Sequence, residues 1–122
     1  MSEIRGWKMH SFVSYAGEPV PAHEISKTIV FKSFFSIVQS LNRLETQALL
    51  LILSDPKNYN DQPSTSNSIK GNVILTYYNR AGLPLGESYL TSEGELQTTG
   101  VEVGGSGYLS CEGSEQLKNI VN

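Results

Sequence analysis

The chain contains one cysteine and two histidines, the residue types most often used for nucleophilic catalysis and zinc binding. Cys111 is the only thiol, and a catalytic thiolate needs a histidine within hydrogen-bond reach. His10 and His23 both lie far from it in the sequence, and the three residues lack the short spacings of a zinc site. A lone cysteine of this kind is most often a small buried apolar residue. We therefore expect no catalytic residue, no metal site and no cofactor, and hence no enzyme.

Two other segments resemble ligand-binding loops in composition but not in spacing. The glycines of residues 104–107 are followed by neither the lysine nor the Ser/Thr of a phosphate-binding loop. Asp55 and Asp61 flank a polar stretch that lacks the central glycine and closing glutamate of a calcium loop. The sequence therefore predicts a flexible connector at residues 104–107 and a surface loop at residues 55–68.

Charge of one sign dominates the last third of the chain. Six glutamates and no lysine or arginine lie between Ala81 and Leu117, so this segment supplies most of the net charge of −3. Such an asymmetry bears on the choice of partner rather than on the fold. Glu112 and Glu115 fall where a terminal helix would begin, and there they would complement the helix dipole. The other four are the predicted partner-binding carboxylates: Glu87, Glu93, Glu95 and Glu102.

Tyrosines accompany these glutamates along the chain. Tyr77 and Tyr78 are neighbours in a predicted strand, so their side chains must point to opposite faces of the sheet. Tyrosine is common at the centre of protein interfaces because it presents a rigid, amphipathic surface. We therefore expect Tyr78 or Tyr89 to anchor a partner beside the acidic residues.

Length and composition are typical of one small soluble domain, which we expect to span residues 1–122. No apolar run approaches the roughly 18 residues that a membrane span needs, and residues 1–8 do not resemble a secretory signal. A single cysteine cannot form an internal disulfide. These features predict a cytoplasmic protein. The pI of about 5.3 argues against nucleic acid as a partner.

The first half of the chain alternates between strand and helix patterns. Residues 6–15 alternate with a period near two, which predicts a strand. Apolar residues then recur every three or four positions over residues 22–44, which predicts a helix. The β-branched run at residues 28–31 would suit a strand equally well, so the helix could begin only near Lys32. The nearly continuous apolar run at residues 46–54 predicts a central strand, with a buried helix as the alternative.

The second half shows three further strand patterns, at residues 72–78, 87–91 and 95–103, and a short helix at residues 114–121. Gly100 interrupts the third strand as a β-bulge would. The predicted fold class is therefore α+β. It comprises a mostly antiparallel sheet (strand-helix-strand, long loop, three-strand meander, short C-terminal helix) packed on one main helix.

These observations favour a non-catalytic protein-binding domain, most concretely a cytoplasmic inhibitor or immunity-type protein. It would neutralise a basic partner, such as a nuclease toxin, through an acidic face of the meander. The alternative is a small-molecule-binding domain or minor enzyme with a pocket between helix and sheet. That pocket would be lined by Phe34, Phe35, Tyr15 and His10. A third possibility is a homo-oligomer that associates through an exposed strand edge.

Overall fold

The computed structural model describes residues 18–63, 71–103 and 107–121 of the chain. These residues form an antiparallel sheet covered by two helices, so the predicted α+β class is confirmed. The strand predicted at residues 6–15 lies outside the described residues, as does most of the connector predicted at residues 104–107. The single domain expected over residues 1–122 stays a prediction.

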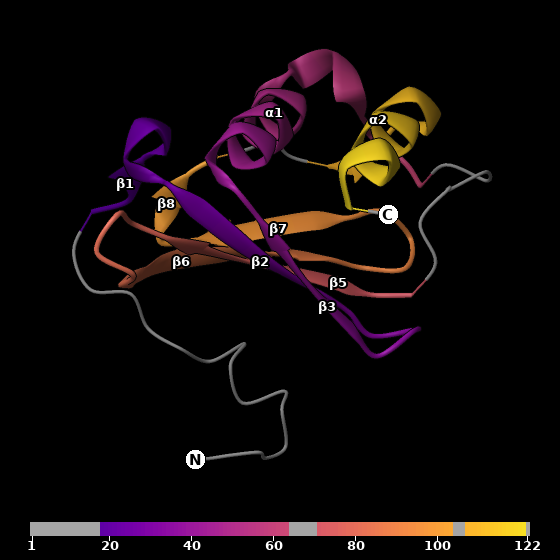
Figure 1. Ribbon diagram of the computed structural model, residues 1–122. Helices are drawn as coiled ribbons and strands as arrows, with labels where there is room; N and C mark the ends of the chain where they lie inside the picture. The colour runs from indigo at the N-terminus through magenta and orange to yellow at the C-terminus, as the bar shows by residue number, and fades with distance from the viewer. Residues whose placement is uncertain (1–17, 64–70, 104–106, 122) are drawn as a thin grey trace.

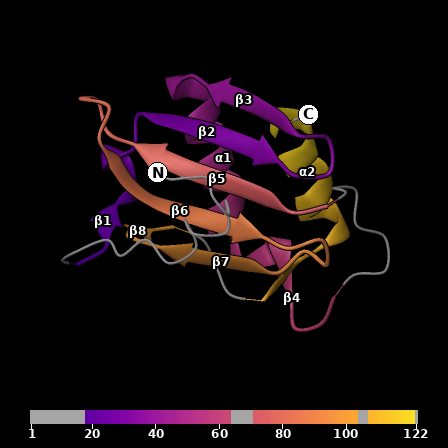
Figure 2. The same ribbon diagram turned by 90° about the horizontal axis from the view of Figure 1, so that it is seen from below.

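The main sheet is built from five strands. They are β2 (Lys27–Lys32), β3 (Ile37–Leu41), β5 (Val73–Tyr78), β6 (Pro84–Leu90) and β7 (Leu96–Thr99). Their order across the sheet is β3-β2-β5-β6-β7, and all neighbours are antiparallel (Figure 2). The hairpin β2–β3 and the meander β5–β6–β7 therefore meet along β2 and β5, and β3 and β7 form the two edges of the sheet.

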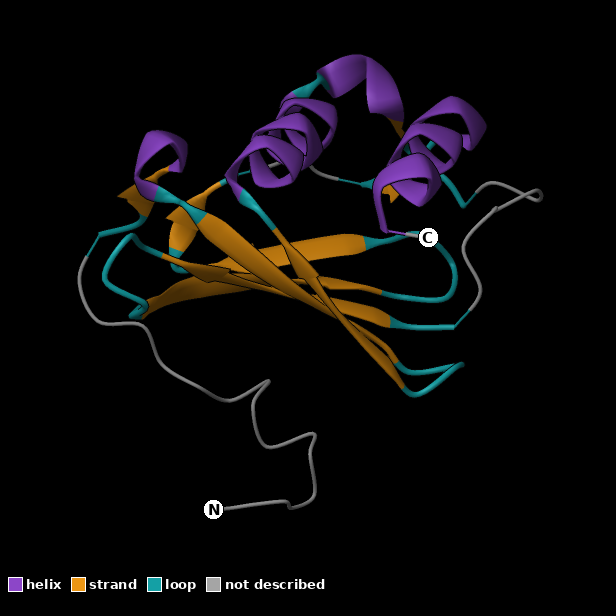
Figure 3. Cartoon of the chain, in the orientation of Figure 1, coloured by secondary structure: helices purple, strands orange, loops and turns teal. Residues whose placement is uncertain are grey.

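Two helices cover the same face of this sheet (Figures 1 and 3). They are α1 (Arg43–Ser54) and α2 (Cys111–Val121), and they also contact each other. We call the opposite, helix-free side of the sheet the open face. Fully buried side chains from both layers fill the space between helices and sheet, among them Leu41, Leu49, Leu53, Leu75, Tyr77, Leu90 and Leu117.

Short elements complete the fold beside the main sheet. These are two separate pairs of two-residue strands and two 3₁₀ turns. They are β1 (Val20–Pro21) parallel to β8 (Val101–Glu102), β4 (Tyr59–Asn60) antiparallel to β9 (Tyr108–Leu109), η2 (Ala22–Glu24) and η3 (Pro56–Asn58). The interruption predicted at Gly100 is confirmed, because β7 ends before it, β8 begins after it, and its φ is +84°.

The helix predicted over residues 22–44 is wrong, because this segment forms η2 and the hairpin β2–β3. In β2 the helix side of the strand is buried and the other side is half-buried, so apolar residues occur at both parities and imitate helical spacing. The β-branched run at residues 28–31 was the signal for a strand. Ser36, with a φ of +53°, closes the turn to β3 and donates its N–H to the Ser33 carbonyl at 3.3 Å.

The central strand predicted at residues 46–54 is also wrong, because these residues belong to α1. A capping box begins this helix: the Asn42 side chain accepts the Glu45 N–H at 2.8 Å, and the Glu45 carboxylate accepts the Asn42 N–H at 2.9 Å. Its buried residues then recur at helical spacing, whereas exposed leucines on the outer face hide that periodicity in the sequence.

The remaining predictions agree with the structure in element type. The meander has its strands close to the predicted positions, and Gly82 occupies the turn between β5 and β6 with a φ of +87°. The C-terminal helix begins at Cys111, three residues earlier than predicted. The surface loop predicted at residues 55–68 is only partly correct, because its described part contains η3 and β4 and buries Asn58.

Candidate functional site

Four large apolar side chains are exposed along one edge of the sheet. Phe34 and Phe35 in the β2–β3 turn are 63% and 52% exposed, and Ile37 and Val38 at the start of β3 are 45% and 66% exposed. The two phenyl rings meet edge to face, with centroids 4.9 Å apart. We call these four residues the apolar edge. Grouped apolar exposure of this kind marks an interaction surface more often than scattered apolar residues do.

The strand that carries the apolar edge has none of the usual protection against pairing. Sheet edges are commonly guarded by charged side chains, proline or a bulge. Residues 33–42 contain no charged residue and no proline, and the register between β2 and β3 is continuous from Lys32↔Ile37 to Thr28↔Leu41. The outer N–H and C=O groups of β3 therefore belong to a strand whose side chains are all apolar or uncharged and polar, so no charged side chain of this strand opposes pairing.

The β2–β3 turn, at one end of the apolar edge, is bound to the segment that precedes β5. Ser33 donates its N–H to the Asn72 carbonyl at 2.9 Å, and its hydroxyl accepts the Asn72 N–H at 3.1 Å. Gly71 packs directly on Phe34, because a Cβ at Gly71 would lie 2.5 Å from the Phe34 Cβ. The backbone that carries the phenylalanines is thus fixed at the start of the turn, which lowers the entropy cost of using them in binding.

The helix side of the same hairpin is fastened to the end of α2. Lys32 is only 8% exposed and its ammonium donates to the Val121 carbonyl, and the Gln39 amide donates to the Ile120 carbonyl at 3.3 Å. A cation near the last carbonyls of a helix is favourable because it complements the helix dipole. α2 therefore positions β2 and β3 from the inside, while no strand of the described residues pairs with the outer edge of β3.

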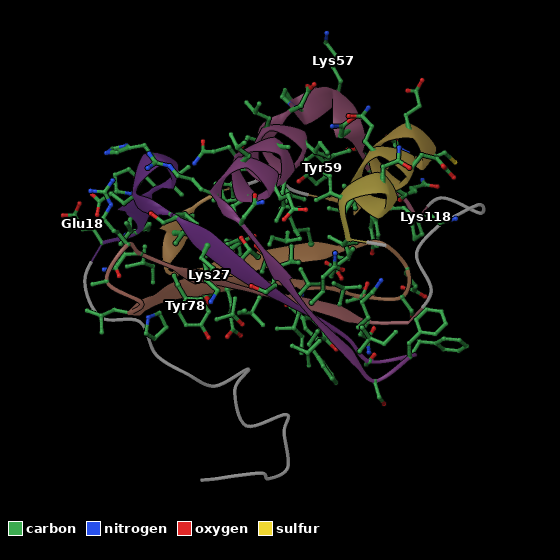
Figure 4. The ribbon with its side chains drawn as sticks, viewed as in Figure 1. Glu18, Lys27, Lys57, Tyr59, Tyr78 and Lys118 are labelled. Carbon is green, nitrogen blue, oxygen red and sulfur yellow. The ribbon has the colours of Figure 1, made fainter. Side chains whose placement is uncertain are left out.

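Three of the predicted partner-binding residues lie on the open face. The register pairs Ile74 with Tyr89 and Thr76 with Glu87, and directly opposite residues share a face. Tyr78 lies on this face beside Lys27 of β2 (Figure 4), whereas Tyr77 is fully buried under the helices. The prediction that Tyr77 and Tyr78 point to opposite faces is confirmed. Glu87 is also on the open face but is buried, at 8% exposed.

The other three predicted carboxylates lie at the two ends of the meander edge. Glu93 is exposed in the β6–β7 turn, and the half-buried Glu95 follows it and forms an isolated bridge with Tyr108. Glu102 is exposed on β8, beyond the opposite end of β7. Glu93 and Glu95 are therefore close to each other. Glu102 is separated from them by the length of β7, and Glu87 by its position within the sheet on β6.

The pocket predicted between helix and sheet does not have the expected lining. Phe34 and Phe35 are exposed in the β2–β3 turn, and Tyr15 and His10 lie outside the described residues. Packed side chains fill the layer between helices and sheet. An open groove does lie elsewhere, between η2, the start of α1 and the β5–β6 turn, and His23 is one of its lining residues.

Cys111 is exposed as the first residue of α2, so the expectation of a buried cysteine is wrong. The reason is helical phase: Leu117 and Val121 point toward the core, and Cys111 falls off that stripe. Glu112 lies in the first turn of this helix, as expected. Over residues 18–63, 71–103 and 107–121, His, Cys, Asp and Glu side chains form no group of three or more that could hold a metal ion.

Comparison with known proteins gives no relative: no family model, no curated protein and no solved structure matches the chain. In the described part of the chain neither helix has the length and apolar character needed to cross a membrane. Neither the apolar edge nor the groove was among the sites predicted from the sequence. The signal for the first was present in the uncharged stretch of residues 33–42, with its two adjacent phenylalanines.

Proposed function

We propose that this protein is a non-catalytic protein-binding domain that engages its partner through the apolar edge. One observation carries the proposal: Phe34, Phe35, Ile37 and Val38 are exposed together on an unguarded edge strand. Leaving these side chains in water is unfavourable, by roughly 25 cal/mol for each Å² of apolar surface. A partner that covers them would recover this free energy.

The geometry favours addition of a strand from the partner to β3. In this mode main-chain hydrogen bonds supply affinity, and alternate side chains supply specificity. The register places Val38 and Ser40 on the open face, and Ile37, Gln39 and Leu41 on the helix side. The phenylalanines at the end of β3 would act as aromatic anchors for the same segment.

The acidic residues give the proposal its more specific form, an inhibitor or immunity-type protein with a basic partner. Glu93 is exposed and Glu95 is half-exposed at the β6–β7 turn, so their charges face the solvent through which a partner approaches. Clustered carboxylates attract a cationic protein and accelerate association, mainly at low salt. In this proposal the apolar edge provides most of the binding free energy, and Glu93 and Glu95 increase the rate at which a basic partner associates.

The proposal is tested with the double substitution Phe34→Ser, Val38→Thr. Both side chains are exposed and threonine suits a strand, so the fold should be retained while apolar contact area is lost. We expect the affinity for a partner co-purified from the native host to fall by at least about tenfold, measured by titration calorimetry. Leu83→Ser is the matched control, because Leu83 is 61% exposed in the β5–β6 turn, away from β3.

Three outcomes are informative. Equal affinities for the wild type and the double variant would contradict the proposal, and so would an equal loss with Leu83→Ser. A partner that is a second copy of the chain would identify the predicted homo-oligomer. In that case the mass from light scattering should fall to that of the monomer in the double variant but not in Leu83→Ser.

A further inference from the structure

The open groove brings together three segments that are distant in the sequence. η2, the first residue of α1 and the β5–β6 turn surround a volume of about 470 Å³. Small-molecule sites commonly have volumes in this range. In Figure 1 η2 and the turn between β5 and β6 lie on the same side of the molecule. The lining residues are His23, Glu24, Ser26, Arg43, Asn79, Arg80 and Ala81.

Hydrogen-bond donors predominate in this lining. Arg43 and Arg80 carry guanidinium groups, which donate in a planar fork, and His23 adds a ring N–H. Glu24 is the one carboxylate among the lining residues. Within the described residues no ion pair and no side-chain hydrogen bond engages Arg43, Arg80 or His23. In a protein of net charge −3, this places unpaired positive charge in one depression.

One backbone hydrogen bond joins two of the segments that line the groove. The Ser26 N–H donates to the Tyr78 carbonyl at 2.8 Å and joins the segment after η2 to the end of β5. The Asn79 side-chain oxygen accepts the Leu83 N–H at 2.9 Å, which leaves its amide NH₂ as a donor. Arg43 follows the N-cap Asn42, so the positive end of the α1 dipole adds to the charge of its guanidinium.

We propose that this groove binds the phosphate group of a small polar metabolite. Arginine forks match phosphate oxygens in pairs, and such charge-assisted hydrogen bonds are stronger than neutral ones. Arg43 at the start of α1 and Arg80 in the β5–β6 turn hold the phosphate, and the Asn79 amide donates to it. Glu24 and Ser26 contact the hydroxyl or amino groups of the remainder of the ligand. The inference is independent of the proposed protein-binding function, because no groove residue belongs to the apolar edge.

The first test is titration of isotope-labelled protein with inorganic phosphate, followed by amide chemical shifts at a constant ionic strength set with sodium chloride. We expect saturable shifts confined to residues 23–26, 43 and 79–82. Arg43→Gln and Arg80→Gln should each weaken binding by about tenfold, the change expected from the loss of one charge-assisted contact. Lys57→Gln is the matched control, because Lys57 is exposed and points away from the body of the molecule (Figure 4).

The outcomes separate a built site from general attraction of anions. Shifts that do not saturate, or a loss with Lys57→Gln equal to that with the arginine variants, would overturn the proposal. A second titration uses glycerol phosphate, which adds hydroxyl groups to the same anion. Tighter binding of glycerol phosphate that Glu24→Gln abolishes supports a metabolite with a polar body. Equal affinities for both anions would overturn that part of the assignment.

Discussion

The hairpin β2–β3 and the meander β5–β7 end in edges of opposite character. The meander edge has Glu93, Glu95 and Glu102 near its two ends, and a bridge from Glu95 to Tyr108 and the short strand β8 lie beside it. The hairpin edge consists of uncharged residues with exposed apolar side chains. Charge and cover are the usual protection of a sheet edge, and within the described residues only the meander edge has them, which supports the proposal that β3 pairs with a partner.

The two halves of the sheet also differ in what holds them together. Beneath the helices, the Tyr77 hydroxyl donates to the Ser88 hydroxyl at 2.6 Å, and Ser88 and Thr98 share a hydrogen bond of 2.7 Å. This chain of hydroxyls joins the three strands of the meander to one another. The hairpin is joined to the meander by the pairing of β2 with β5, and its side chains bond to both helices. Thr28 shares a hydrogen bond of 3.0 Å with Thr46 of α1, and Lys32 donates to the Val121 carbonyl of α2. Substitutions in the meander and in the hairpin therefore test how much each set of contacts contributes to the free energy of unfolding.

The largest effect is expected from Gly86→Ala in the meander. A Cβ at this buried position would lie 2.3 Å from the Thr99 carbonyl oxygen, so β6 and β7 would have to separate. We expect the free energy of unfolding to fall by about 3 kcal/mol in urea denaturation. Gly82→Ala is the control: it meets no atom within 4 Å but has a φ of +87°, and it should cost about 1–2 kcal/mol. Equal losses would show that the meander is not tightly packed at Gly86.

Lys32→Met should have the next largest effect and tests the anchoring of the hairpin. The substitution removes the donor to the Val121 carbonyl but keeps the apolar stem, so we expect a loss of about 2 kcal/mol in unfolding free energy. Lys27→Met, on the open face of the same strand, should change it by less than about 0.5 kcal/mol. An unchanged unfolding free energy in Lys32→Met would show that the Lys32 contact does not anchor the hairpin on α2.

A smaller, pH-dependent effect distinguishes the meander. Burial raises the pKa of Tyr77 above its usual value, so the native state keeps a proton that the unfolded state releases near pH 10. The contribution of this group is complete below pH 10 and is lost as the pH rises, by about 1.4 kcal/mol per pH unit. Tyr77→Phe should flatten the decline of unfolding free energy between pH 10 and pH 11. An identical slope in wild type and variant would contradict this account.

The smallest effect in free energy is expected at the meander edge. Glu93→Gln with Glu95→Gln should lower the association rate with a basic partner by up to about tenfold at low salt, and leave dissociation nearly unchanged. Stopped-flow kinetics at two salt concentrations measures both rates. The control is Glu18→Gln with Asp61→Asn, which changes net charge equally at exposed residues outside the sheet. Equal slowing in both variants would indicate that net charge, and not this turn, governs association.

Sequence patterns were sufficient for the meander and insufficient for residues 22–54. The strands of the meander were predicted mainly from β-branched and aromatic residues between turn glycines such as Gly82 and Gly94, which are signals that do not depend on a visible period. β2 shows apolar residues at both parities, whereas α1 has Leu44 and Leu51 on its outer face, at 81% and 75% exposure. In each element the apolar pattern of the sequence departs from the burial pattern of the structure, so the strand and helix assignments were exchanged.

The candidate site could be predicted only in part, for a related reason. Alternation alone predicts that Tyr77 and Tyr78 face opposite sides, and the structure agrees. Exposure of Phe34 and Val38 depends on β3 being an edge strand, which follows from strand order and not from local pattern. The groove likewise requires η2, α1 and the β5–β6 turn to meet in space, and no local pattern encodes that meeting.

The exposed position of Cys111 has a practical consequence for all of these measurements. It is the one cysteine in the sequence, and α2 presents it at the surface. A maleimide dye would therefore attach to the unmodified protein at a single, known position. Energy transfer from that dye to an acceptor on a captured partner would report where the partner sits, without any substitution in the sheet.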